Sequence, residues 1–112
     1  MKNKYLYINK YKYMNMNEDL RILKAISDET RLKIVKLLLS GEKCVSEITP
    51  LIGKSQSNIS IQLSHLKNAG VVESRRQGKK AYYSLSSEKA IKMINALSEI
   101  PEINAADFVE EV

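Results

Sequence analysis

The spacing of apolar residues along the chain predicts mostly helices. In residues 17–26 apolar side chains recur at intervals of three after an Asn-Glu-Asp start, which is typical of a helix with its cap. A second helix is predicted from a cap at Ser27 or Asp28 to a stop at Gly41. Its apolar positions are Leu32, Ile34, Val35, Leu38 and Leu39. A short third helix is predicted within residues 44–52, with Gly53 after it, and Pro50 keeps it brief.

Residues 54–70 predict a fourth helix with two contrasting faces. At about 100° per residue, Ile59, Leu63 and Leu66 fall within roughly 40° of one another and form the predicted buried stripe. The opposite side carries Lys54, Ser57, Asn58, Ile61, Ser64 and His65. The chain Asn-Ala-Gly at 68–70 ends this helix.

The remaining pattern predicts a hairpin and a last helix. Residues 71–76 and 81–85 are β-prone arms around Gly78, which suits a tight turn. A final helix is predicted from residue 86 or 87 to about residue 97, and Pro101 limits its continuation. The predicted fold is therefore mainly α with a small β-hairpin, in the order of a winged helix-turn-helix.

Charge divides the chain into three parts around one predicted domain. Residues 1–16, a basic extension rich in Tyr, Asn and Lys, carry a net charge of +4, the domain at 17–98 carries +6, and the tail at 99–112 carries −5. A length of 112 residues suits a single small domain. A basic domain suggests a polyanionic partner, although a solvated surface gives the same composition.

Several classes of function are disfavoured by what the sequence lacks. No apolar run approaches the roughly 20 residues of a membrane span, and no secretory signal is recognisable, so a cytoplasmic location without a membrane partner is expected. Cys44 and His65 are the only residues of their types, too few for a disulfide or for a structural zinc site within one chain. We expect no metal and no cofactor. No nucleophile-base pair or glycine-rich phosphate loop indicates an enzyme.

The outer face of the fourth helix has the chemistry of a DNA-reading helix. Such a helix fits the major groove, where small polar side chains bond to base edges without the repulsion that carboxylates meet near phosphates. Ile61 can contact a thymine methyl group. His65 is either a DNA contact or an ordinary exposed residue. The candidate DNA-binding residues of this helix are Ser55, Gln56, Ser57, Asn58, Ser60, Ile61, Gln62, Ser64 and His65.

The predicted hairpin carries a cluster of cations beside that helix. Arg75, Arg76, Lys79 and Lys80 can bind a phosphate backbone or place an arginine in the minor groove, and they are the candidate DNA-binding wing. The alternative is a merely solvated edge. On the first interpretation, reversing the charge of Arg75 and Arg76 weakens all DNA binding.

Residues from about 20 to 97 resemble the ArsR/SmtB-type transcriptional repressors. The matching strings are LKAISDETRLKIVKLLL, EKCVSEI and SQSNISIQLSHLKNAGVVESRRQGKKAYYSL. The resemblance implies a dimeric winged helix-turn-helix protein, in a family where many members release DNA on binding a metal or another signal. It further implies that residues 55–62 open the recognition helix, that the hairpin is the wing, and that the first and last helices form the dimer interface.

Three departures from that family bear on regulation. Arsenic-type sensors have Cys-Val-Cys where this chain has Cys44, Val45 and Ser46, which leaves too few thiolates for a soft metal in one subunit. The last helix has none of the histidine ligands of zinc-type sensors, and Ile61 stands where relatives often have Arg. Cys44 is then either a packing residue or a thiol sensor.

The sequence therefore predicts a dimeric, sequence-specific DNA-binding regulator of repressor type, bound to a palindromic double-stranded operator. The alternative is a winged-helix module for protein interaction, in which the acidic tail and the basic extension dock a partner. The operator, a small-molecule or metal effector, and the true start of the chain stay open.

Overall fold

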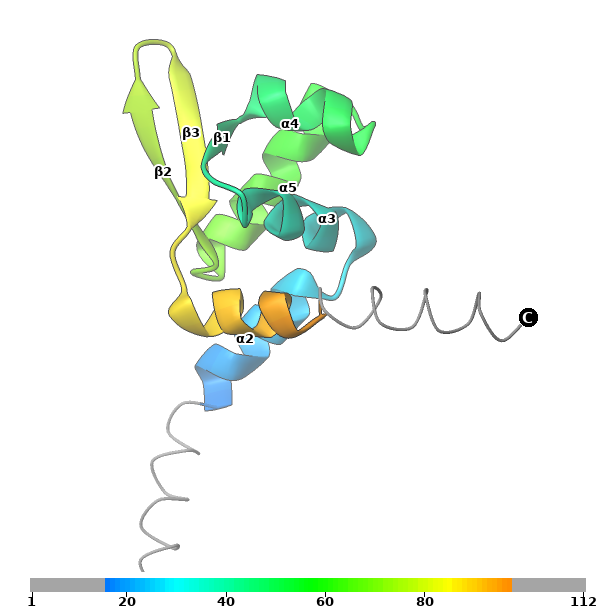
Figure 1. The fold of residues 1–112 in the computed structure, drawn as a ribbon, viewed down its shortest axis with the longest axis vertical. Helices are drawn as coiled ribbons and strands as arrows, with labels where there is room; N and C mark the ends of the chain where they lie inside the picture. The colour runs from blue at the N-terminus through cyan, green and yellow to red at the C-terminus, as the bar shows by residue number, and fades with distance from the viewer. Residues whose placement is uncertain (1–15, 98–112) are drawn as a thin grey trace, which may run out of the picture.

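The computed structural model describes residues 16–97, and they form the predicted winged helix-turn-helix (Figure 1). The elements are α2 Met16–Ile26, α3 Glu29–Leu38, β1 Lys43–Cys44, α4 Val45–Ile52, α5 Gln56–Asn68, β2 Val72–Gln77 and β3 Lys80–Leu85, followed by a helix at 88–97. The predicted tail lies outside the described residues, and so does the predicted extension except for Met16. None of the described helices is long and apolar enough to cross a membrane.

Every helix contributes side chains to a single apolar core. In the helices that bury more than one residue, the buried positions follow patterns such as i, i+3, i+4 or i, i+1, i+4, so each of these helices buries one face. Fully burying an aliphatic side chain of this size contributes about 1.5–3 kcal/mol. The largest fully buried side chains are Ile22, Ile34, Val35, Ile48, Ile59, Leu63, Leu66, Val71 and Ile94.

Helix α3 begins at one of the two predicted caps and ends earlier than predicted. The Asp28 carboxylate accepts a hydrogen bond from the Arg31 backbone N–H at 3.0 Å, so Asp28 rather than Ser27 is the N-cap. The helix ends at Leu38, and the backbone N–H groups of residues 39–41 each donate to the carbonyl three residues earlier. The predicted stop thus lies in the loop after the helix.

A three-residue turn joins α4 to α5. Gly53 has φ of 81°, a conformation that favours glycine, and its N–H donates to the Thr49 carbonyl at 2.9 Å. Ser55 then caps α5 by accepting a hydrogen bond from the Asn58 backbone N–H at 3.1 Å. Pro50 lies inside α4, which ends two residues later, so the prediction of a brief helix is confirmed.

The sheet contains a strand that the sequence did not predict. Strand β1 pairs antiparallel with β3, with Lys43 opposite Tyr83 and Cys44 opposite Tyr82, and the strand order is β1-β3-β2. Two residues are too few to show alternation, so only the pairing with β3 defines β1. The predicted hairpin is confirmed, with its first arm shifted by one residue and its second arm starting one residue earlier. In its two-residue loop Gly78 has φ of 65°, as the first position of a type II′ turn requires.

The terminal helices divide their apolar residues between the core and the surface. Ile26 and Ile94 are buried, whereas Leu20, Leu23 and Leu97 are 44%, 46% and 40% exposed. Met16 is also exposed, at 45%. Outward apolar side chains on α2 and on the helix at 88–97 are available for contact with another surface.

The buried stripe of α5 can be tested by truncation. We expect Leu63→Ala to lower the free energy of unfolding by about 2–5 kcal/mol, because it leaves a cavity in a closely packed core. The neighbouring exposed Ser64→Ala is expected to change it by less than about 0.5 kcal/mol. Urea unfolding at a fixed protein concentration measures both. Similar values for the two variants would contradict this orientation of α5.

Candidate nucleic-acid interface

Burial of one stripe of α5 turns the opposite face outward. Ile59, Leu63 and Leu66 are fully buried, whereas Ile61 is 56% exposed. The other exposed residues of this helix are Gln56, Ser57, Ser60, Ser64, His65, Lys67 and Asn68. No acidic residue occurs between Glu47 and Glu73. The outer face is therefore small, polar and free of carboxylates, with one aliphatic side chain near its centre.

Two amide residues at the edge of that face are turned toward the protein. The Gln62 Oε1 atom accepts a hydrogen bond from Arg31 Nη1 at 2.8 Å, and Arg31 Nε donates to the Ala25 carbonyl at 2.6 Å. Asn58 Oδ1 is buried and has no hydrogen-bond partner among the residues that the structure describes. Gln62 thus ties α5 to α3, and the Asn58 acceptor points away from the surface that would meet DNA.

The hairpin divides its two arginines between opposite faces. Directly paired residues share a face of an antiparallel sheet, and successive residues alternate. Arg75 is opposite Tyr82, whereas Arg76 is opposite Ala81 and shares its face with Ser74. Lys67 of α5 donates a hydrogen bond to Ser74 Oγ at 2.8 Å. Arg76 therefore lies on the face toward α5, and Arg75 lies on the other.

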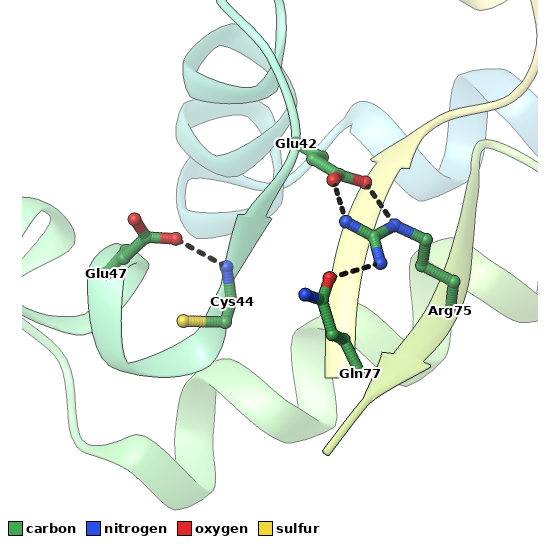
Figure 2. A network of polar contacts seen from close by, with 5 residues as sticks. All are labelled: Glu42, Cys44, Glu47, Arg75 and Gln77. Atoms are coloured by element: carbon green, nitrogen blue, oxygen red, sulfur yellow. Dashed lines mark hydrogen bonds and ion pairs between the residues drawn. The ribbon is translucent and has the colours of Figure 1, made fainter. Parts of the chain in front are cut away.

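The Arg75 side chain is bound by the carboxylate of Glu42, in the loop before β1 (Figure 2). Its Nε donates to Glu42 Oε2 at 3.0 Å and its Nη2 forms an ion pair with Glu42 Oε1. Its Nη1 donates to Gln77 Oε1 at 2.8 Å, and its guanidinium lies 5.0 Å from the centre of the Tyr82 ring. The hydrogen bond from Arg75 lowers the pKa of the Glu42 carboxyl below its ordinary value of 4.5 and raises the pKa of Arg75.

The other wing cations line a hollow between the hairpin and the helix-turn-helix. We call this space, of about 470 Å³, the wing hollow. Arg76 Nη1 donates to the Lys79 carbonyl at 3.3 Å, which fixes it across the turn. The hollow is lined by Cys44 before α4, Ser46 of α4, Gln56 and Ser60 of α5, and Arg76, Lys79, Lys80 and Tyr83 of the hairpin, together with Val45 and Ala81. The structure thus brings the predicted recognition helix and wing together at this hollow. Arg75 is the one predicted wing residue that does not line it.

Comparison with known proteins places this geometry in a family. Residues 28–74 match the model of the bacterial regulatory protein arsR family. A biofilm growth-associated repressor of Xylella fastidiosa is 41% identical over 81 residues, which cover 72% of this chain and 71% of that protein. The chain belongs to the arsR family. It is accordingly a DNA-binding transcriptional regulator and not an enzyme.

Solved structures of arsR-type regulators share the fold. The transcriptional repressor BigR from Xylella fastidiosa is 37% identical, with a TM-score of 0.74 over 82% of this chain and 94% of that one. A homodimeric winged helix-turn-helix DNA-binding domain from Mycobacterium bovis is 29% identical, with a TM-score of 0.71 over 90% of both chains. ArsR-family regulators bind DNA and often form homodimers.

Cys44, the candidate thiol sensor of this arsR-family chain, is a buried residue. It is 3% exposed, and its Sγ lies 3.1 Å from Ser46 Oγ. Its backbone N–H donates to Glu47 Oε1 at 2.9 Å (Figure 2), which closes the start of α4 and lowers the pKa of the Glu47 carboxyl. Within residues 16–97 no three His, Cys, Asp or Glu side chains are grouped so that they could hold a metal ion. These contacts favour the packing interpretation of Cys44.

Three residues of this region were missed by reasoning from the sequence. Ser46 lines the wing hollow, Glu42 holds Arg75, and Arg31 positions Gln62. Only Ser46 had a signal, since it lies in the first turn of the first helix of a helix-turn-helix, and that helix crosses the DNA backbone in such motifs. The other two act across more than 30 residues of chain and depend on tertiary packing.

The pair of Glu42 and Arg75 predicts an acid titration. Because the carboxylate is stabilised by Arg75, we expect Glu42 to titrate below 4.5, so the pair persists at neutral pH and is lost as the pH falls through this lowered pKa. In Arg75→Gln the pKa of Glu42 should return toward 4.5. Arg76→Gln, which removes the same charge from the other face, should leave it lowered. Carboxyl NMR titration measures both, and equal effects of the two variants would contradict the assignment.

Proposed function

We propose that two copies of this chain bind a palindromic operator, with each α5 in a major groove and each wing on the adjacent backbone, and so repress transcription. The observation that carries this proposal is the wing hollow, where three cations lie beside a helix face without carboxylates. Phosphates are held by cations and by the N–H and O–H groups at helix starts, while base edges are read from the groove. The wing cations lie beside the outward face of α5 that carries the exposed polar side chains.

Base recognition is assigned to the most outward residues of α5. Ser57 and Ser64 are exposed beside Ile61, and their hydroxyl groups can donate to or accept from base edges. Ile61 would contact the thymine methyl group. Asn58 and Gln62, predicted from the sequence as DNA contacts, play a smaller part in this proposal because their oxygens face the protein.

Dimerisation is assigned to the terminal helices. Leu20, Leu23 and Leu97 expose apolar side chains on α2 and on the helix at 88–97, and such surface is stabilised when another copy covers it. The solved relative from Mycobacterium bovis is described as homodimeric. A twofold dimer places its recognition helices about one turn of DNA, roughly 34 Å, apart, which requires a palindromic site. A cytoplasmic location follows from this role as a prediction.

The wing is tested by the salt dependence of binding to random-sequence duplex DNA. A dimer that neutralises about eight phosphates has a log-log salt slope near −7. Arg76→Gln removes one contact in each subunit and should reduce the steepness by about 1.8, whereas Arg75→Gln, with the same charge loss, should change it by less than about 0.5. Fluorescence anisotropy measures the slopes. A wild-type slope near zero would refute the proposal. Equal slopes for the two variants would show that Arg76 does not contact phosphate.

The reading role of Ile61 is tested by comparing specific with random DNA. On an operator selected in vitro from random duplexes, Ile61→Ala should weaken binding by roughly tenfold, about 1.4 kcal/mol, because a methyl contact in the groove is lost. Random-sequence DNA is the internal control, since phosphate contacts are unchanged there. Equal losses on both DNAs would show that Ile61 does not read bases.

A further inference from the structure

A second cationic hollow lies on the other side of α5 from the wing. This space, which we call the α2 hollow, has a volume of about 300 Å³. Its polar lining consists of Arg21 and Lys24 of α2, Arg31 of α3, and His65 and Asn68 of α5. No acidic residue lines it. The site described above uses none of its three permanent cations for DNA.

On α5, the lining residues of the wing hollow and His65 of the α2 hollow lie on opposite sides of the outward face. At about 100° per residue from Ile59, Gln56 and Ser60 of the wing hollow lie near 60° and 100°. In the α2 hollow, His65 lies near 240°, on the other side of Ile61 at about 200°, whereas Asn68 lies near 180°, within the outward face itself. In Figure 1 the hairpin tip and α2 also occupy opposite ends of the molecule, with α5 between them.

The α2 hollow combines one fixed cation with two adaptable ones. Arg31 is held in place by the carbonyl of Ala25 and by Gln62 Oε1, at 2.6 and 2.8 Å. Arg21 and Lys24 are exposed and three residues apart, so they project from the same side of α2. A fixed guanidinium beside two long flexible cations suits a phosphate oxygen on an extended polymer, because the flexible side chains can follow the backbone.

The geometry points to a second phosphate contact on the DNA. The major groove is about 12 Å wide and has a phosphate backbone along each edge, so a helix lying in it has phosphates on both flanks. We propose that the α2 hollow binds the backbone on one edge of the groove while the wing hollow binds the backbone on the other. This inference rests on the proposed function and extends it to residues of α2, outside the helix-turn-helix and the wing.

The test uses Arg21→Gln and Lys24→Gln, separately and together, in the full-length chain. Both residues are exposed, so substitution leaves the core intact. On random-sequence duplex DNA each single variant should reduce the steepness of the salt slope by about 1.8, because each contact occurs twice in the dimer and contributes about 0.9. The matched control is Lys92→Gln, an exposed lysine that lines neither hollow, which should keep the wild-type slope.

The outcomes separate this inference from the function on which it rests. If the wild type shows no salt-dependent binding, the proposed function itself fails. If the wild type binds steeply and both single variants match Lys92→Gln, only the α2 contact is overturned. The inference is also overturned if inorganic phosphate shifts the NMR resonances of His65 while both variants keep the wild-type slope, since the hollow then binds a small anion and not the DNA backbone.

Discussion

The structure depends on the burial of three side chains of α5. Ile59, Leu63 and Leu66 are inaccessible to solvent, and a rotation of the helix by one residue, about 100°, would expose at least part of this stripe. Polar contacts on both flanks add to this constraint, since Gln62 is bound to Arg31 of α3 and Lys67 to Ser74 of β2. The core therefore decides which residues face outward, and the outer face can consist of small polar groups because none of them is needed for packing.

The carboxylates that form ion pairs bind cations that line neither of the two hollows beside α5. The ion pairs within residues 16–97 join Lys33 to Glu29, Lys89 to Glu18 and Asp19, and Arg75 to Glu42. No carboxylate lines either hollow beside α5. Exposed pairs of this kind contribute little to stability, so their importance is in which cations they occupy. Glu42 pairs with Arg75, while Arg76, one residue later, lies on the face toward α5.

The features predicted from the sequence are those with a local physical cause. The period of Ile59, Leu63 and Leu66 gave the buried face of α5, and Gly53 and Gly78 marked turns that need a positive φ. Strand β1 has only two residues and exists through its pairing with β3. Asn58 and Gln62 lie at the edge of the buried stripe, where a helical wheel does not show whether a side chain faces the surface or the interior. Likewise, Glu42 and Arg75 are 33 residues apart, and nothing in either segment indicates their contact.

In the proposed complex, different residues provide the affinity for DNA and the preference for a base sequence. The outward centre of α5 has serine hydroxyls and Ile61 but no guanidinium or ammonium group, so in the proposed complex its contacts with bases are hydrogen bonds and apolar contacts that release few counterions. The cations lie in the hollows beside it, where in the proposed complex they meet phosphates whatever the base sequence. Salt should therefore weaken binding to operator and to random DNA by similar factors, leaving their ratio nearly constant. Changes in the flanking cations can then alter how much DNA the regulator binds overall without altering which base sequence it prefers.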